Sequence, residues 1–200
     1  MKAGRKRAFD KDVALDKAMR LFWANGYSGT SLSDLTTTLG INKPSLYAAF
    51  GNKEQLFKAS LDHYSKCYGE PNLLKLREPE DASLEERLKA YMLSVANLVT
   101  DPALPKGCLL VKSTCESGSE AVPEEITYSL KSIKSEKEKT LIALFSKEKK
   151  QGALSQDTDV EQLTSYVTAV LYGIGVLAKN GATMKTLQPV IEIAVKAIFL

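Results

Sequence analysis

The sequence predicts an all-α protein of nine helices, divided into a small N-terminal domain and a larger C-terminal helical bundle. Helix-capping residues recur along all 200 residues, and apolar residues between them repeat at intervals of three and four. The alternating pattern of a strand does not stand out anywhere in the sequence. Apolar residues make up 44% of the chain and charged residues 26%, which is sufficient for a well-formed core.

Four short helices are expected in residues 1–68, as a three-helix domain followed by a connecting helix. Ser31 with Asp34, and Asn52 with Gln55, have the three-residue spacing of a capping box, which begins a helix. Glycine, which readily adopts the left-handed conformation that ends a helix, follows each of the first three: Gly26, Gly40 and Gly51. The predicted ranges are 10–25, 31–40, 42–49 and 52–68.

Residues 69–79 contain two prolines and a glycine and are expected to form a connection rather than a helix. We therefore place the domain boundary between residues 68 and 69, with residues 69–200 as the larger domain. Ser83 and Glu86 have capping-box spacing, and Pro123 suits the first turn of a long helix. The five helices predicted here are 83–99, 106–117, 123–150, 159–179 and 184–200.

The last two predicted helices are unusually apolar. In 184–200 the polar residues Gln188, Glu192 and Lys196 form one narrow stripe, and most of the remaining surface is apolar. Gly173 and Gly175 lie inside 159–179, where each costs roughly 1 kcal/mol relative to alanine, and close approach of another helix would compensate. These features predict a homodimer formed through the last two helices; the alternative is an intramolecular core with a kinked helix.

Charge is unevenly distributed along the chain, whose net charge is +3. Residues 1–68 hold 11 Lys and Arg against 6 Asp and Glu, a net of +5, whereas residues 69–200 hold 16 against 18, a net of −2. Affinity for a polyanion is therefore expected in the first third of the chain. The basic run Arg5–Arg7 would add contacts to a nucleic-acid backbone.

A helix-turn-helix is expected around Gly40. Leucines on 31–40 supply a packing face, and Leu46 and Phe50 bury one side of 42–49, which leaves its other side polar and outward. Taken singly, such residues can equally be helix caps, a half-buried tyrosine and solvated lysines. Together they are candidate DNA contacts, in the groove or at helix N-termini: Thr30, Ser31, Asn42, Lys43, Pro44, Ser45, Tyr47 and Lys53.

The stretch from Ala14 to Phe57 resembles the TetR family of bacterial transcriptional regulators. The matching pattern is A-x-x-x-A-x-x-L-F-W-x-x-G-Y-x-x-T-S-L-S-D-L-x-x-x-L-G-I-x-K-x-S-L-Y-x-x-F-G-x-K-E-x-L-F. The resemblance implies a three-helix DNA-binding domain, a helical ligand-binding domain, a dimer through the last two helices and a repressor released by a small-molecule effector. It implies phosphate contacts by Thr30, Ser31, Tyr47 and Lys53 and groove contacts by residues 42–45. Two copies would read a near-palindromic double-stranded operator.

An apolar effector pocket is expected between the long helices of the second domain. Candidate lining residues supply apolar wall and a few hydroxyls: Tyr91, Val95, Cys108, Val111, Tyr128 and Tyr166.

Thiol sensing at Cys108 is the alternative. The stretch K-G-C-L-L-V-K-S-T-C resembles one found in a TetR subgroup that includes electrophile and oxidant sensors. On one helix Cys108 and Cys115 would lie about 10 Å apart, beyond the roughly 7 Å limit for a disulfide, with both thiols facing inward. Lys106 and the helix N-terminus would lower the pKa of the Cys108 thiol; the structural reading is a small buried hydrophobe.

The sequence offers little for catalysis. The single histidine, His63, has no metal-ligand partner by spacing, and neither a Gly-rich phosphate loop nor a nucleophile elbow is found. We therefore expect no enzyme activity, metal or cofactor; the alternative is a helical carrier or enzyme that has lost DNA binding. The lysines of 131–150 indicate a solvated helix face.

Composition also bears on location. Three cysteines without disulfide-scaffold spacing suit a reducing compartment. The basic N-terminus precedes no apolar signal-peptide core, and no segment is expected to have the unbroken apolar length of a membrane span. We expect a cytoplasmic protein without a membrane partner.

Overall fold

The computed structural model describes residues 9–79 and 81–199, and the predicted basic run Arg5–Arg7 lies outside them. Within the described residues the fold is all-helical, as predicted, and no strand is present there. The elements are α1 (Lys11–Asn25), α2 (Leu32–Leu39), α3 (Lys43–Phe50), α4 (Lys53–Tyr64), the π-helical segment η1 (Ser65–Gly69), α5 (Glu70–Leu74), α6 (Leu84–Thr100), α7 (Leu109–Glu116), α8 (Glu124–Lys150), α9 (Val160–Lys179) and α10 (Met184–Lys196). Since α4, η1 and α5 are continuous, these ranges make the nine helices expected.

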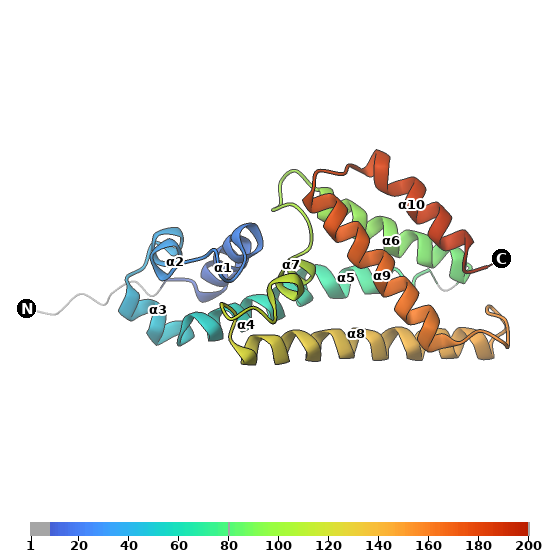
Figure 1. Ribbon diagram of the computed structural model, residues 1–200, viewed down its shortest axis with the longest axis horizontal. Helices are drawn as coiled ribbons and strands as arrows, with labels where there is room; N and C mark the ends of the chain where they lie inside the picture. The colour runs from blue at the N-terminus through green and yellow to red at the C-terminus, as the bar shows by residue number, and fades with distance from the viewer. Residues whose placement is uncertain (1–8, 80, 200) are drawn as a thin grey trace, which may run out of the picture.

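The molecule is elongated, with α1, α2 and α3 at one end and the C-terminal bundle at the other (Figure 1). The run α4–η1–α5 extends from the first group into the second, alongside α8. The small N-terminal group is therefore joined to the bundle by a helix that both parts share.

The connecting helix is longer than the sequence predicted. Residues 69–79 were expected to be non-helical, but the helix continues through η1 to Leu74. Pro71 lies in the first turn of α5, where its missing N–H costs little. The π-helical turn before it carries the chain past Gly69 without a break. The non-helical connection is therefore confined to residues 75–83.

The capping patterns formed where they were predicted. Ser31 and Asp34 bond reciprocally at the start of α2, as do Asn52 and Gln55 at the start of α4. Gly40 has the left-handed backbone of a helix end, with φ 66° and ψ 30°. These local bonds fix the turns that orient α2, α3 and α4.

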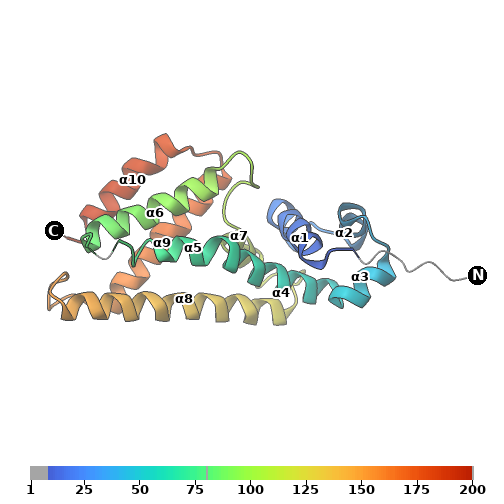
Figure 2. The same ribbon diagram turned by 180° about the vertical axis from the view of Figure 1, so that it is seen from behind.

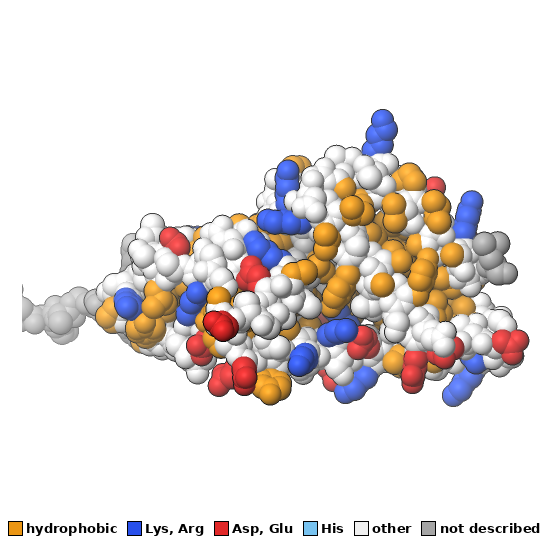
Figure 3. Space-filling view, viewed as in Figure 1, with side chains coloured by type: hydrophobic (Ala, Val, Ile, Leu, Met, Phe, Trp, Pro, Cys, Tyr) orange, Lys and Arg blue, Asp and Glu red, His pale blue; other side chains and the backbone are white. Residues whose placement is uncertain are grey.

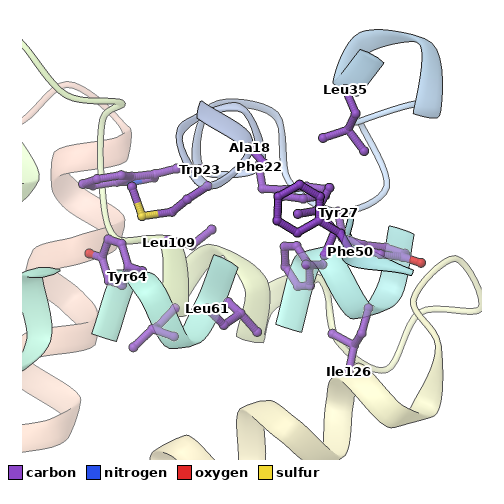
Figure 4. Close-up of a cluster of buried hydrophobic side chains, with 14 of the residues drawn as sticks. Ala18, Phe22, Trp23, Tyr27, Leu35, Phe50, Leu61, Tyr64, Leu109 and Ile126 are labelled. Carbon is purple, nitrogen blue, oxygen red and sulfur yellow. The ribbon is translucent and has the colours of Figure 1, made fainter. Parts of the chain in front are cut away.

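The N-terminal core is aromatic and crosses the predicted domain boundary (Figure 4). Phe22 meets Phe57 edge to face, with ring centroids 4.8 Å apart, and both side chains are fully buried. Leu109 of α7 and Ile126 of α8 belong to the same buried cluster. Helices from the second domain thus complete the core of the first.

The bundle core lies between α6, α8, α9 and α10. A buried ion pair joins Arg87 to Glu148 at 2.9 Å, and Arg87 also donates to the carbonyls of Leu76 and Ala82. Because all three contacts use one guanidinium, a single side chain ties the 75–83 connection to the last turns of α8.

An apolar face of α9 and α10 is left uncovered in the monomer (Figure 3). Its exposed members include Val176, Leu177, Val190 and Ile193, the last with 71% of its surface accessible. Gly173 has open space beside it, whereas a Cβ on Gly175 would lie 3.2 Å from Val111, so only the latter glycine serves packing within the chain. An intramolecular core cannot account for the exposed part of this face.

The prediction that no segment could span a membrane was wrong for α9, which has the length and apolar composition to do so. A core or interface helix of a soluble protein passes the same test, and most of the apolar stretch of α9 is unburied in the monomer. The apolar composition of α9 is explained by the uncovered apolar face that α9 and α10 form together. The latter helix ends at Lys196 rather than at the predicted residue 200, which lies outside the described residues.

A charge at Ile193 should separate the dimer. Burying an unpaired carboxylate in an apolar interface costs about 3 kcal/mol or more, so Ile193→Glu is expected to raise the dimer dissociation constant at least roughly a hundredfold. Sedimentation equilibrium measures this. Gln188→Glu, on the polar stripe of the same helix, is the matched control and should stay dimeric. A wild-type monomer at micromolar concentration, or an unchanged Ile193→Glu dimer, would contradict the prediction. Ile191 is fully buried within the chain, so a charge there would test folding instead.

Candidate nucleic-acid interface and internal cavity

The outward face of α3 lies at the tip of the molecule (Figure 1). Leu46 and Phe50 anchor the helix in the core, while Lys43, Pro44 and Tyr47 are exposed. The Lys43 ammonium lies 5.8 Å from the centroid of the Tyr47 ring. The short helix therefore presents a cation and a phenol side by side to solvent.

Asn42 has a structural role that limits what it can contact. Its side-chain oxygen accepts the backbone N–H of Ser45 at 2.9 Å and caps α3. The side-chain NH₂ of Asn42 is then the group that can donate to a partner outside the chain. Ser45 is half-buried beside this cap.

The structure corrects the role predicted for Thr30. Thr30 is 1% exposed and its hydroxyl donates to the carbonyl of Gly26 at 2.7 Å, so it closes the turn before α2 and is not presented to solvent. Ser31 is exposed, but its hydroxyl donates to Asp34 at 2.7 Å. Hydrogen bonds from the side chain and backbone of Ser31 lower the pKa of Asp34, whose carboxylate already occupies the anion position of this helix N-terminus.

Lys53 begins α4 and is held by an aromatic ring. Its ammonium lies 4.1 Å from the centroid of Tyr27, and the side chain is half-buried. Burial lowers the pKa of Lys53, and the nearby carboxylate of Glu116 opposes that shift. Lys53 is thus a positioned cation between α4 and the turn that precedes α2.

Helix α7 lies between the N-terminal helices and α9 (Figures 1 and 2). Glu116, at its last turn, accepts the backbone N–H of Tyr27 at 2.9 Å. Gly26 has a φ of 82°, and a Cβ there would lie 1.8 Å from the Glu116 carboxylate. The backbone conformation at this position therefore favours glycine, and a Cβ would displace the end of the Glu116 side chain from its place beside Tyr27.

Three further hydrogen bonds fix the end of α1. The Lys112 ammonium donates to the carbonyls of Trp23, at 3.3 Å, and Ala24, which are among the unsatisfied carbonyls of a helix C-terminus. The Trp23 indole donates to the carbonyl of Gly107 at 2.8 Å. We refer to the contacts made by Lys112 and Glu116 of α7, and by Gly107 just before it, as the α7 clamp.

The other side of α7 borders an internal cavity of about 90 Å³ with mostly apolar walls. Four of the predicted lining residues border it: Tyr91, Val95, Cys108 and Val111. Tyr128 and Tyr166 do not, which corrects the prediction for both. Tyr128 is 65% exposed because Ile126 and Leu130 take the inward face of α8. Tyr166 donates its hydroxyl to the carbonyl of Ala194 on α10 at 3.3 Å.

The α8 wall of the cavity was missed at the sequence level. Leu130, Ile133, Lys137 and Leu141 line it from one helix face, at spacings of three and four. Lys137 therefore occupies a position in an apolar stripe, and reading 131–150 as a wholly solvated face was wrong for this residue. The signal was the uninterrupted spacing of the apolar residues on either side of it.

The two cysteines of α7 differ in their surroundings. Cys108 is half-buried at the N-cap, where its sulfur accepts a hydrogen bond from the Tyr64 hydroxyl at 3.4 Å. Burial raises the pKa of Tyr64 well above its usual value, so that phenol stays protonated as the donor. Cys115 is exposed, and the expectation that both thiols face inward was wrong for it. The described residues contain no cluster of His, Cys, Asp and Glu suited to a metal.

Family models match both parts of the chain. The model described as bacterial regulatory proteins, tetR family, matches residues 14–60, and that described as tetracyclin repressor-like, C-terminal domain, matches residues 85–192. The HTH-type transcriptional repressor ComR of Escherichia coli (strain K12) is 34% identical over 187 residues, which cover 94% of this chain and 88% of ComR. BdcR, an HTH-type transcriptional repressor of the same organism, is 27% identical over 195 residues, with coverages of 98% and 92%.

A solved relative gives the same result in three dimensions. The TetR family transcriptional regulator CifR, in a cysteine-substituted form complexed with 26-bp double-strand operator DNA, matches with a TM-score of 0.88. The two chains are 34% identical, and the match covers 98% of this chain and 100% of that one.

A helix-turn-helix at one end of an all-helical chain, attached to a larger helical domain, defines a class of DNA-binding regulators. Within that class, the extent and identity of these matches show that the chain belongs to the TetR family of bacterial regulatory proteins.

Proposed function

We propose that this protein is a homodimeric, operator-binding transcriptional repressor in the cytoplasm, released from DNA by a small molecule that enters the cavity beside α7. The observation that carries the proposal is the exposed face of α3, where a lysine, an amide and a tyrosine project from a helix whose other side is locked into the core. Residues 1–68 act as the DNA-binding unit, and residues 69–200 bind the effector and dimerise. ComR and BdcR, its relatives, are transcriptional repressors.

In a dimer formed through α9 and α10, a two-fold axis relates the two α3 helices, so the operator is near-palindromic. Lys43, Tyr47 and the Asn42 amide face the groove, with Pro44 and Ser45 at its edge. Lys53 binds a phosphate, because it is a cation in the first turn of a helix. Ser31 contributes less than its exposure suggests, since Asp34 engages its hydroxyl.

The α7 clamp provides the link between effector and operator. Val111 borders the cavity, while Lys112 and Glu116 on the same short helix hold the end of α1 and the turn before α2. A ligand that displaces α7 must therefore move the DNA-binding unit or break these bonds. The resulting shift cannot exceed the difference in the ligand's affinity for the two arrangements.

The α3 and α4 cations should make separable contributions to operator binding. Lys53→Met should weaken binding to every DNA sequence and reduce the slope of log affinity against log salt by about one, as for one lost phosphate contact. Lys43→Ala should cost about 1–3 kcal/mol on the operator and much less on random DNA if it contacts a base. Fluorescence anisotropy with an operator selected from a random pool measures both effects.

The control for charge is Lys139→Met, an exposed lysine on α8 that lowers the net charge equally. It should leave operator affinity unchanged. If Lys43→Ala with Tyr47→Ala bound the operator as tightly as wild type, α3 would not be the reading helix.

Two substitutions of Glu116 separate the effect of its hydrogen bond from the effect of its negative charge. Glu116→Gln keeps an oxygen that accepts the Tyr27 N–H but removes the negative charge near Lys53, whereas Glu116→Ala removes both. Without the tether, the DNA-binding unit must be ordered when it binds, which costs on the order of 1–2 kcal/mol. We therefore expect operator affinity about tenfold weaker for Glu116→Ala than for Glu116→Gln. Equal affinities for these two variants would show that the tether does not position the unit.

A further inference from the structure

The cavity beside α7 contains a cation without a partner. Three charged residues of α8 line it, and two of them, Lys134 and Glu138, pair with each other at 3.7 Å. No hydrogen bond or ion pair engages the Lys137 ammonium within the described part of the chain. Burial lowers the pKa of Lys137, and the nearby Cys108 thiol opposes that shift. The Lys137 ammonium is not among the fully buried atoms that lack a partner, so it keeps some contact with solvent at the edge of the mostly apolar cavity. A cation held there can pair with an anion that enters from solvent.

A second unsatisfied polar group lines the same surface cleft as Lys137. Ser65, the first residue of η1, has a fully buried hydroxyl oxygen with no hydrogen-bond partner in the described structure. Ser65 and Lys137 both line a surface cleft between η1 and α8, of about 470 Å³. The exposed side chains of Asp62, Lys66, Glu70 and Glu136 line it as well, and Glu136 is paired with Lys139. Buried hydroxyls are normally bonded, and π-helical turns occur frequently at functional sites. Two donors without acceptors therefore border one cleft.

Lys137 stands where the cleft meets the cavity. Leu73, Ile133 and Lys137 line both spaces, whereas Ser65 lines only the cleft and Tyr91 and Val111 only the cavity. A ligand that enters from the cleft would thus place its polar end near Ser65 and Lys137 and its apolar end inward. The cavity, at about 90 Å³, is smaller than the roughly 150 Å³ engineered cavity that binds benzene, so the apolar end is short.

We propose that the effector site takes a short-chain monocarboxylate, whose carboxylate accepts hydrogen bonds from the Lys137 ammonium and the Ser65 hydroxyl while a tail of about four carbons fills the cavity. As a statement about the effector, this rests on the proposed function; as a binding site, it does not depend on DNA. The class differs from a neutral lipophile, which would use the apolar walls but leave both donors unsatisfied.

Calorimetric titration of the DNA-free protein with pentanoate and with pentanamide tests the site. The two probes share a tail and differ in charge, so pentanoate is expected to bind at least tenfold more tightly to wild type. Lys137→Met should abolish that preference without lowering the melting temperature, because methionine restores an apolar residue to the stripe. Ser65→Ala should weaken pentanoate severalfold. Lys139→Met, on the exposed side of α8, should behave as wild type.

Equal affinity of wild type for the acid and the amide, or full pentanoate affinity in Lys137→Met, would overturn the proposal. So would binding of octanamide but not of pentanoate, which would identify a neutral lipophile as the occupant.

A second titration, with operator DNA present, separates this proposal from the proposed function. Release of the operator by pentanoate in wild type but not in Lys137→Met supports both. Pentanoate binding without operator release would leave the carboxylate site intact and overturn its role as the effector site. Failure of the ligand-free protein to bind any selected DNA would instead overturn the proposed function.

Discussion

The contact between α7 and the C-terminal end of α1 is the interaction on which the rest of the structure depends. The Trp23 indole, the carbonyls that end α1 and the Tyr27 amide are polar groups that a free three-helix unit would have to leave to water. Helix α7 and Gly107, just before it, satisfy all of them, and Leu109 closes the aromatic core from the same side. The N-terminal unit is therefore not an independent body on a flexible linker: its position is fixed by the helix that also forms a wall of the cavity.

Two features of the bundle lower the stability of the isolated chain, and the N-terminal unit has neither of them. Apolar side chains on α9 and α10 remain exposed until a second copy covers them, and a lysine occupies an otherwise apolar stripe of α8. Surface optimisation of a monomer would remove both features. Each is understandable if it serves binding, the first of a second chain and the second of an anionic ligand. At these positions the isolated chain is less stable, and binding of a second chain or of a ligand compensates for that loss.

Local signals made most of the fold predictable. Caps such as Ser31–Asp34 and the glycine at position 40 act within four residues, so the sequence alone locates them. Tertiary effects were not visible in the same way. The burial of Thr30 depends on a turn held by α7, the helix through Pro71 depends on a π-turn, and the outward direction of Tyr128 depends on which side of α8 meets the bundle. Lys137 was the exception, because the spacing of the apolar residues on either side of it predicts that it lies on the inward face of α8.

The central claim, that α7 holds the DNA-binding unit in place, is tested most directly by the hydrogen exchange of one amide. The Tyr27 N–H lies in a turn outside any helix and donates to Glu116 of α7. In wild type it should exchange slowly by NMR, and in Glu116→Ala it should lose that protection while the amides within α1 keep theirs. Rapid exchange of the Tyr27 amide in wild type, at the rate found in Glu116→Ala, would contradict the claim.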